Sequence, residues 1–441
     1  MARLKWSMST KFPVLQVALD MANLHRAIQI SKEAVEGGVD WIEVGTPLIK
    51  SEGMEAIRSL RRTFPKHTIV ADMKTADVGG YETEMAAKSG ADVMVILGVS
   101  NDGTILEAIR AGKQYNCKIM CDLISVIDKV GRAREIEALG ADYLALHIGI
   151  DQQMEGDSPV TELRDIVEAV DIPVAVAGGL NSETVAEVVE AGASIVVVGG
   201  AIIKARDVTG ATAVLLEAIE SRKKIETKLF KKYTFDQLRE VLSQVSSCNV
   251  SDAMHRKGAL RDLQILLPPG AKMVGPVLTV KTMDGDWAKP VEAIERANKG
   301  DVIVIDAGGG FQAIWGELAS WSSKVKGIAG VVIDGAARDV TDIVEMGFPV
   351  FARHLVPNAG EPKGLGEIGV DVIVSGQKAS TGDWIIGDQS GVVVIPRRRA
   401  VEVANRALDV HEKENRLREE IQRGSTLSEV LYLEKWETMK E

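Results

Sequence analysis

The first half of the chain alternates between short, strongly apolar runs and longer stretches with helical periodicity. Eight apolar runs have the length and composition of buried strands: residues 15–20, 41–46, 68–74, 93–99, 118–124, 143–149, 173–180 and 195–202. Nearly continuous apolar strands that alternate with amphipathic helices are typical of a parallel sheet covered by helices. The pattern predicts eight strand–helix units in this half.

A repeat of glycines marks the ends of four predicted helices. Gly38, Gly90, Gly140 and Gly192 recur about every 50 residues, each after an amphipathic stretch and before an apolar run. Glycine is the usual residue just past a helix end. Eight units with an internal repeat of two units favour a TIM (β/α)8 barrel, with an open doubly wound sheet as the alternative. We predict that this α/β barrel domain covers residues 1–222.

Polar and glycine residues gather at one end of the predicted strands. At or near the carboxyl ends lie Asp20, Glu43, Asp72, Lys74, Asp122, His147 and Asp151, with the pairs Gly178–Gly179 and Gly199–Gly200. A TIM barrel brings all these strand ends to one mouth, where enzymes of this fold place catalysis. Surface charge without a function would fall at both ends of the strands, so the one-sided distribution indicates an active site.

The two glycine pairs follow the seventh and eighth predicted strands, which is the usual phosphate site of a TIM barrel. Backbone N–H groups of a glycine turn and the N-terminus of a helix bind anions there. We therefore expect a small phosphorylated substrate at Gly178, Gly179, Gly199 and Gly200, with Asp151 close to the same substrate.

The carboxylates suggest a metal ion. Glu43 and Asp72 come from adjacent predicted strands and offer the hard oxygen ligands that Mg²⁺ or Mn²⁺ prefers. Side chains alternate along a strand, so Lys74 shares a face with Asp72 and can face a substrate oxygen. A metal ion and an ammonium group can stabilise an enediolate, made by removing a proton beside a carbonyl. His147 is the expected proton carrier near neutral pH.

Six motifs of this half resemble the 3-hexulose-6-phosphate synthase family, which belongs to the orotidine-5′-monophosphate decarboxylase-like barrels. They are LQVALD, EVGTP, DMKTAD, LHIGIDQQ, AGGL and VGGAI, in this order on the predicted strands. The resemblance implies a Mg²⁺-dependent aldolase that condenses formaldehyde with ribulose 5-phosphate, or that catalyses the reverse cleavage.

The family's functional residues transfer to the matching positions of this chain. The resemblance implies that Glu43 and Asp72 are metal ligands and that Lys74 is the partner of the enediolate. It also implies that Asp20 contacts a substrate hydroxyl and that His147 is the acid/base.

The same resemblance implies a homo-oligomer in which barrel dimers share sites. Asp77 is the last acid of the superfamily's Asp-x-Lys-x-x-Asp signature and, by resemblance, reaches into the site of a partner subunit. The alternative is a 3-keto-L-gulonate-6-phosphate decarboxylase, which has the same barrel and metal pair. Members of that family tend to carry an arginine after the sixth-strand histidine and another after strand eight. This chain has HIGIDQQ and VGGAIIKARD there, which favours the synthase.

A basic stretch follows the predicted barrel. We interpret residues 223–234 as a solvated linker, and residues 235–441 as a second domain that carries five of the seven tryptophans. The apolar runs of this second half do not repeat the period of the barrel, so it is not a copy of the first domain. A charged amphipathic helix is predicted over residues 398–423, and we expect it to pack on its own domain or on a neighbouring subunit.

Two short motifs carry the candidate chemistry of the second half. WGELAS places Glu317 at an expected helix start, and DGAARD places Arg338 beside Asp339 in a turn after a buried strand. An arginine can hold a carboxylate through two hydrogen bonds while a neighbouring acid binds a metal. An ion pair within a turn is the alternative explanation for Arg338 and Asp339.

These two motifs, together with SSCNVSDAM, DVIVIDAGG, GFPVFAR and GDQSGVVVIP, resemble the regulator of ribonuclease activity A-like family. That family has an α/β fold of the swivelling type and includes 4-hydroxy-4-methyl-2-oxoglutarate aldolases. The resemblance implies a divalent metal held by Asp339 and, through water, by Glu317, with Arg338 on a pyruvate carboxylate. The N–H groups of Leu318 and Ala319 are then oxyanion donors. We expect a second metal-dependent lyase, and the alternative is a regulatory or assembly module without catalysis.

Composition sets the wider class of protein. The 63 acidic residues outnumber the 52 Lys and Arg residues, giving a formal net charge of −11, so we expect no nucleic-acid partner. No apolar run approaches the roughly 20 residues that span a bilayer, and the first twelve residues lack the apolar core of a signal peptide. We expect a cytoplasmic enzyme of carbohydrate metabolism whose partners are a phosphosugar and formaldehyde.

Overall fold

The computed structural model describes residues 13–147 and 160–433 and divides into two compact units. The first comprises Met1–Lys232 together with Glu412–Glu441, and the second comprises Tyr233–His411. The domain limits expected from the sequence (1–222, 223–234 and 235–441) stay a prediction. The division by contacts assigns the last part of the chain to the barrel unit.

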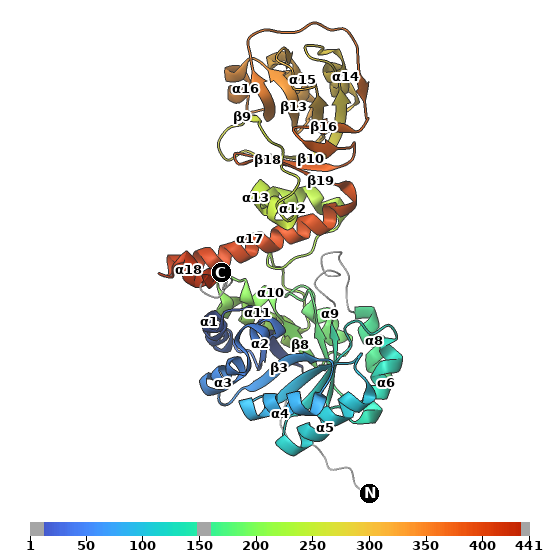
Figure 1. Ribbon diagram of the computed structural model, residues 1–441, viewed down its shortest axis with the longest axis vertical. Coiled ribbons are helices and arrows are strands. Elements are labelled where there is room, and N and C mark those ends of the chain that lie inside the picture. Colours follow the sequence, from blue (N-terminus) through green and yellow to red (C-terminus); the bar gives the residue numbers. More distant parts are fainter. Residues whose placement is uncertain (1–12, 148–159, 434–441) are drawn as a thin grey trace, which may run out of the picture. The chain divides into compact units, whose positions relative to one another are not determined.

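The first unit contains a closed barrel of eight parallel strands in chain order, as the sequence predicts (Figure 1). The strands are β1 (Val14–Ala18), β2 (Trp41–Val44), β3 (Thr68–Thr75), β4 (Val93–Leu97), β5 (Lys118–Asp122), β6 (Tyr143–His147), β7 (Val174–Ala177) and β8 (Ile195–Val198). Each strand pairs in parallel with the next, and β8 pairs with β1 to close the barrel. The TIM-type barrel is confirmed, and the open sheet is excluded.

Helices follow the strands and surround the barrel (Figure 1). They are α1 (Leu24–Glu36), α2 (Thr46–Glu52), α3 (Met54–Thr63), α4 (Gly79–Ser89), α5 (Asp102–Tyr115), α6 (Lys129–Leu139), α8 (Val160–Ala169), α9 (Val185–Glu190), α10 (Gly200–Ile203) and α11 (Val208–Ser221). Gly90 and Gly140 end α4 and α6 with φ angles of 107° and 98°, in the left-handed region. Glycine adopts this conformation without a Cβ penalty, which explains the repeat in the sequence.

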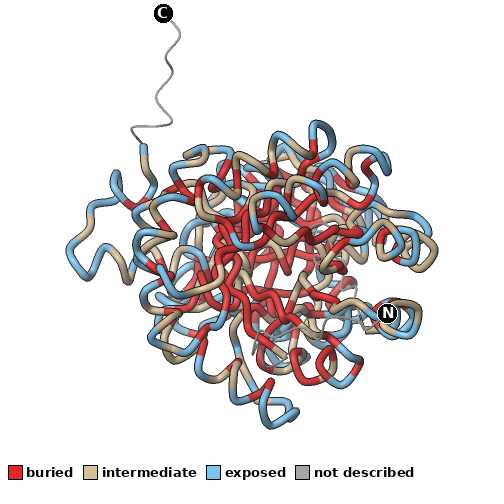
Figure 2. The backbone as a smooth tube through the Cα atoms, turned by 90° about the horizontal axis from the view of Figure 1, so that it is seen from below, coloured by how far each residue is buried: buried red, intermediate tan, exposed pale blue. Residues whose placement is uncertain are grey.

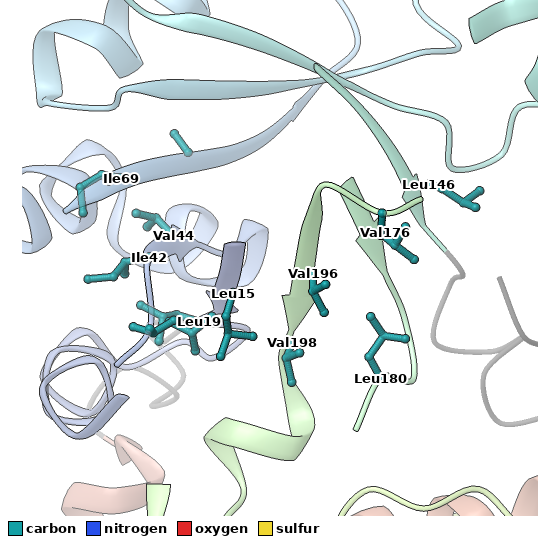
Figure 3. Packing of buried hydrophobic residues seen from close by; sticks show 14 of the residues in the cluster. Leu15, Leu19, Ile42, Val44, Ile69, Leu146, Val176, Leu180, Val196 and Val198 are labelled. Atoms are coloured by element: carbon teal, nitrogen blue, oxygen red, sulfur yellow. The ribbon is translucent and has the colours of Figure 1, made fainter. Parts of the chain in front are cut away.

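Alternation along the strands separates an outer layer of apolar side chains from the barrel interior. The outward-facing side chains of β1, β2 and β8, such as Leu15, Ile42 and Val196, pack into one large cluster with the helices (Figure 3). The intervening residues, such as Val14 and Trp41, form a smaller cluster inside the barrel. In the backbone coloured by burial, buried stretches gather toward the middle of the view and exposed stretches toward its edge (Figure 2).

The second unit is built on a mixed sheet with the strand order β19-β18-β10-β11-β13-β14-β9, to which β12 and β15 add short pairs. Its strands are β9 (Gln264–Leu266), β10 (Met273–Lys281), β11 (Val302–Asp306), β12 (Ala313–Trp315), β13 (Gly330–Ala337), β14 (Val350–Leu355), β15 (Glu367–Ile368), β18 (Trp384–Asp388) and β19 (Gly391–Ile395), beside a separate hairpin of β16 (Val372–Val374) and β17 (Gln377–Ala379). The strands β10, β11, β13 and β14 are parallel, and β9, β18 and β19 add antiparallel edges. This arrangement confirms the α/β class of the second half.

The helices of the second unit are short, except for the last. They are η1 (Phe235–Gln237), α12 (Leu238–Gln244), α13 (Ser247–Ala253), α14 (Ala288–Arg296), α15 (Glu317–Lys326), α16 (Val340–Met346) and η2 (Arg397–Arg399), followed by α17 (Ala400–Gln422). The first turns of α17 contribute buried residues such as Val403 and Ala407 to an apolar cluster with α12 and β18.

The helix predicted over 398–423 is present, but the expectation about where it packs is wrong for its last part. From Glu412 onward, α17 and the following α18 (Leu427–Leu431) belong to the barrel unit. Arg416 of α17 is 1% exposed and forms an ion pair with Glu33 of α1. Buried ionic partners on α1 are invisible in a pattern of apolar residues, and therefore the sequence did not reveal this contact.

Candidate active sites

The polar residues of the barrel lie on the inward-facing side of the strands. Residues 14, 16 and 18 of β1 face inward, and so do 41 and 43 of β2, 70 and 72 of β3, and 120 and 122 of β5, because alternate side chains share a face. Apolar residues such as Val14, Trp41, Val70 and Met120 form the interior cluster, and the carboxylates of Glu43, Asp72 and Asp122 follow two positions later on β2, β3 and β5. Because side chains alternate along each strand, the predicted acids of β2, β3 and β5 lie together at the mouth of the barrel.

Lys74 is the centre of the polar network at the mouth. Its Nζ atom lies 2.9 and 3.0 Å from the two carboxylate oxygens of Asp72 and 2.7 Å from Oδ2 of Asp122. Lys74 has a φ of 50°, and the pairing of β3 with β4 shifts register at this point. Burial alone would lower the pKa of Lys74, but the carboxylates of Asp122 and Asp72 outweigh burial and raise it above its ordinary value. Lys74 is therefore held as a charged ammonium group.

Asp122 joins Lys74 to His147. Its Oδ2 atom lies 3.4 Å from Nδ1 of His147, and its Oδ1 atom accepts the N–H of Ile124 at 2.9 Å. Asp122 is 1% exposed. Burial by itself would raise its pKa, but the hydrogen bond with His147 and the charge of Lys74 hold the pKa below its usual range. The sequence marks Asp122 only as a residue at a strand end, and its place between two predicted catalytic groups comes from the structure.

Glu43 and Asp20 complete the acidic side of the mouth. Glu43 is 8% exposed, and Oε2 of its carboxylate accepts a hydrogen bond from Nε2 of Gln16 at 2.5 Å. Burial, followed by the negative charges of Asp72 and Asp20, raises the pKa of Glu43 well above its ordinary value. Loss of hydration within the mouth, followed by the charge of Asp72, also raises the pKa of Asp20, although that residue as a whole remains exposed.

These acids fit a magnesium ion that keeps several water ligands, for which one or two carboxylates suffice. Burial and, after it, repulsion from Asp72 and Asp20 raise the pKa of Glu43, and a cation would relieve that repulsion. Beside Glu43, the Oε1 atom of Gln16 is buried without a hydrogen-bond partner, as an acceptor next to a water or ion site would be. Within residues 13–147 and 160–433 no group of three or more His, Cys, Asp or Glu side chains could hold a metal. A metal ion held by Glu43, Asp72 and water stays a prediction.

Two further residues missed by the sequence hold the acids in place. The hydroxyl of Thr46 donates to Oδ2 of Asp72 at 2.8 Å and lies 2.9 Å from its backbone oxygen. Gln16 is 1% exposed and holds Glu43 as described. Gln16 lies on the inward face of β1, and Thr46 is the first residue of α2, two positions after the end of β2. Neither carries a charge that would single it out in the sequence.

The remaining predicted residues of the barrel are the two glycine pairs, Asp77 and Asp151. Gly178 and Gly179 have φ angles of 110° and 69° after β7. Gly199 follows β8, and Gly200 is the first residue of α10. Both glycine pairs therefore stand at the same end of the barrel as the acids. Asp77 is exposed, and its carboxylate accepts the N–H of Val78 at 2.7 Å instead of joining the network around Lys74. The prediction for Asp151 concerns a residue outside the described part of the chain.

The candidate residues of the second unit line one cavity of about 380 Å³. Glu317, Leu318 and Ala319 come from the start of α15, and Arg338 and Asp339 follow directly after β13. The strand runs to Ala337, so only Arg338 and Asp339 of the DGAARD motif form the turn that the sequence predicts. Sequence motifs that lie about 20 residues apart thus meet at one site.

Asp339 connects the two segments of this cavity. Its Oδ2 atom accepts the N–H of Glu317 at 3.0 Å and lies 3.4 Å from Nε of Arg338. Asp339 itself has a φ of 60°, and a side chain at Gly316 would collide with its carboxylate at 2.5 Å. The first turn of α15 leaves its N–H groups without acceptors inside the helix, so Leu318 and Ala319 offer donors to the cavity. Arg338 and Asp339 can therefore form an ion pair with each other and also line a ligand site.

Comparison with known proteins agrees with the barrel and its motifs. The model of the orotidine 5′-phosphate decarboxylase / HUMPS family matches residues 13–214. The 3-hexulose-6-phosphate synthase of Bacillus subtilis is 41% identical over 194 residues, which are 44% of this chain and 92% of the relative. The chain belongs to this family. The synthase of Mycobacterium gastri is 39% identical over 46% of this chain and 99% of its own length.

Family membership rests on the first half of the chain, and a separate family matches the second. A solved structure of 3-hexulose-6-phosphate synthase from Salmonella typhimurium is 36% identical and covers 47% of this chain and 99% of its own, with a TM-score of 0.46. The RraA-like model, described as Aldolase/RraA, matches residues 247–394. The resemblance of each half is confirmed, and the chain joins two kinds of domain in one polypeptide. None of the helices in the described residues could cross a membrane, because none is both long and apolar enough.

Proposed function

We propose that the barrel is an aldolase that condenses formaldehyde with D-ribulose 5-phosphate to D-arabino-hex-3-ulose 6-phosphate, or cleaves that product. The observation that carries the proposal is Lys74, held as an ammonium between Asp72 and Asp122 with His147 beside them. Relatives that carry the synthase name are about 40% identical over nearly their whole length, which supports a lyase of this kind.

The glycine turns after β7 and β8 are proposed to bind the phosphate group of the sugar through backbone N–H groups. Asp20, at the same mouth, accepts a hydrogen bond from a sugar hydroxyl. This arrangement leaves the carbonyl end of the sugar over Lys74. The role of Asp151 as a further substrate contact stays a prediction.

In the forward direction, a proton leaves the carbon beside the carbonyl of ribulose 5-phosphate, and the electron pair moves onto the carbonyl oxygen. Lys74 stabilises the negative charge of the enediolate with its fixed ammonium group. The enediolate carbon then forms a bond with the carbon of formaldehyde, whose oxygen becomes an alkoxide. His147 carries the proton between the substrate and that oxygen, and Asp122 keeps its ring oriented through Nδ1.

Glu43 and Asp72 are proposed to hold a Mg²⁺ or Mn²⁺ ion in this site. Such an ion supplies positive charge near the oxygens on which negative charge develops. Gln16 keeps the carboxylate of Glu43 in position, and Thr46 does so for Asp72.

Asp77 is proposed to act in the site of a second barrel. Its carboxylate is exposed and takes no part in the network of its own mouth, which is the arrangement that a shared site requires. Mixing an Asp77→Ala variant with a Lys74→Ala variant tests this role. If sites are shared, the mixture regains about a quarter of wild-type activity, as statistics predict for dimers with one intact site; activity no higher than that of the separate variants would refute it.

The reaction is tested by incubating the full chain with ribulose 5-phosphate, formaldehyde and Mg²⁺, and separately with 3-keto-L-gulonate 6-phosphate. We expect a hexulose phosphate from the first mixture. Release of CO₂ from the second mixture, with none of the hexulose phosphate from the first, would favour the decarboxylase instead.

For the second unit we propose a metal-dependent lyase that acts on a 2-oxo or 4-hydroxy-2-oxo acid. The cavity lined by Glu317, Arg338 and Asp339 supports this function, since it combines a cation for a carboxylate with two acids and helix N–H groups. Asp339 with Glu317 would hold the metal ion, which would supply charge for an enolate oxygen. Oxaloacetate and 4-hydroxy-4-methyl-2-oxoglutarate are the substrates to test, and a lack of cleavage of both with Mg²⁺ and Mn²⁺ would favour a regulatory or assembly module.

A further inference from the structure

The segment that follows α11 packs on the loop after β7, next to the glycine pair proposed for phosphate. Ile225 and Ser182 exchange two hydrogen bonds, from the N–H of Ile225 at 3.0 Å and from the hydroxyl of Ser182 at 2.8 Å. The amide of Asn181 donates to the backbone oxygen of Phe230 at 3.3 Å. Ser182 and Asn181 are both 4% exposed, so this loop is fixed by chain that lies beyond the barrel's last helix.

The same segment also covers the loop after β8. The ring of Phe230 lies against Gly200, where an added Cβ would stand 2.2 Å from a ring atom. Lys204 lies 5.0 Å from the centre of that ring, and Lys232 lies 4.2 Å from it. Phe230 is 8% exposed and belongs to the main apolar cluster of the barrel. One aromatic side chain therefore closes over the first residue of α10.

Phe230 is in turn held by the last part of α17. The N–H of Phe230 donates to Oε1 of Glu412 at 2.6 Å, and Glu412 is 6% exposed. One turn later, the guanidinium group of Arg416 lies 2.9 Å from a carboxylate oxygen of Glu420 and 3.1 and 3.2 Å from the two oxygens of Glu33.

Arg416 also reaches the chain directly after α10. Its NH1 group lies 3.4 Å from the backbone oxygen of Ala205 and 3.3 Å from that of Arg206. In Figure 1 the end of α17 lies beside α1 and α10, in agreement with these contacts. The loop after β8 is thus held at Gly200 by Phe230 and at residues 205–206 by Arg416.

We propose that residues 225–232 and 412–423, here called the clamp segments, are positioning elements that hold both glycine loops in the conformation that binds the substrate's phosphate. The clamp segments lie outside the residues matched by either family, which are 13–214 and 247–394. Phosphate binding in this chain therefore depends on residues outside both family matches. That the two glycine loops bind the substrate's phosphate rests on the function proposed above, whereas the contacts of the clamp segments with these loops do not.

The test uses full-length Phe230→Ala with Phe235→Ala as its control, because Phe235 is 42% exposed and lies in the second unit. An unclamped loop must be ordered at the moment of binding, and this ordering weakens affinity. We expect the KM for ribulose 5-phosphate to rise about tenfold, equivalent to roughly 1.4 kcal/mol, with kcat within about twofold of wild type. Phe230→Leu, which keeps an apolar cover, should restore most of the affinity.

A second pair of variants tests the helix. Arg416→Met should act in the same direction as Phe230→Ala, whereas Arg418→Met should not, because exposed Arg418 contacts Asn415 of its own helix. Amide hydrogen exchange gives a measurement without turnover. We expect exchange to speed up in peptides that cover 178–184 and 199–206 in Phe230→Ala and Arg416→Met, but not in the controls.

The outcomes separate the clamp from the proposed reaction. Faster exchange in these peptides, together with weaker binding of ribulose 5-phosphate in calorimetry, supports the clamp even if no aldol product forms. Unchanged exchange and an unchanged KM in Phe230→Ala would overturn it. A fall in kcat with constant KM would also overturn it, since the clamp acts on binding of the phosphate group.

Discussion

Asp122 is buried and contacts both Lys74 and His147, and we predict the effect of removing its charge. The substitution Asp122→Asn keeps the size of the side chain and removes its charge. Lys74 then loses the partner at 2.7 Å but keeps Asp72 at 2.9 Å. A hydrogen bond to a charged group contributes about 1.5–3 kcal/mol, and since Lys74 remains paired, we expect a loss of about 2 kcal/mol.

The assay is thermal unfolding of the full chain, followed on the transition of the barrel unit. A loss of about 2 kcal/mol lowers the Tm of a domain of this size by about 4–8 °C. Asp102→Asn is the matched control: its ion pair with Arg132 is exposed at 59% on the aspartate side, and such surface pairs contribute about 0–1 kcal/mol. We expect the control to unfold within about 3 °C of wild type.

The pH dependence gives a second test of the same contact. The pKa of Asp122 lies below its ordinary value in the folded protein, so the stability that its charge contributes is present above the unfolded pKa of 3.8. That contribution is lost as pH falls through the lower, folded pKa. The Tm difference between wild type and Asp122→Asn should therefore be full at pH 6 and shrink below about pH 4.

On turnover, Asp122→Asn should lower kcat about 100-fold, the usual effect of losing one fixed electrostatic group in an active site. Equal Tm values at pH 6, or a difference that persists unchanged at pH 3, would refute the assignment of Asp122 as a charged partner. A wild-type kcat would refute its part in positioning Lys74 and His147.

Three further predictions follow from the sites and the packing. Asp72→Asn should abolish turnover that depends on added Mg²⁺ while circular dichroism stays unchanged; hexulose phosphate formed at the wild-type rate would contradict the metal site. Arg338→Ala should abolish cleavage of oxo acids by the second unit with little change in Tm, because its side chain is 44% exposed; cleavage by the purified variant would rule out the role proposed for this arginine. Gly360→Ala should lower the Tm of the second unit strongly, since its Cβ would stand 1.8 Å from the backbone oxygen of Gly285, whereas Gly103→Ala, which meets nothing within 4 Å in α5, should be neutral or stabilising by about 0.5–1 kcal/mol. Equal Tm values for the two glycine variants would argue against the packing at Gly360.

The barrel could be predicted from the sequence because its signals are local. Each strand is a short apolar run, and glycines such as Gly90 and Gly140 occupy left-handed positions that other residues rarely adopt. The same alternation that buries Val70 places Asp72 inside the mouth. The alternation of apolar and polar residues was therefore enough to predict where the charged residues at the strand ends lie.

What the sequence did not reveal depends on contacts between distant segments. Gln16 is an uncharged residue in an apolar strand, and only its distance to Glu43, 27 positions away, gives it a role. The contact of Arg416 with Glu33 joins positions 383 apart. The exposed side of a long charged helix and its buried ionic side have similar composition, so the sequence could not tell which side of α17 faces the barrel.

The division of the chain has a consequence for the order of events during synthesis. The barrel unit takes in Glu412–Glu441, yet the whole of Tyr233–His411 lies between Lys232 and that last piece. At the usual pace of about 5–20 residues per second, a ribosome needs roughly 10–40 s to translate the intervening unit. During that interval the eight strands are already available, while Glu412 and Arg416 are not. Until the second unit has been made, the nascent barrel therefore lacks the contacts that Glu412 and Arg416 make near its mouth.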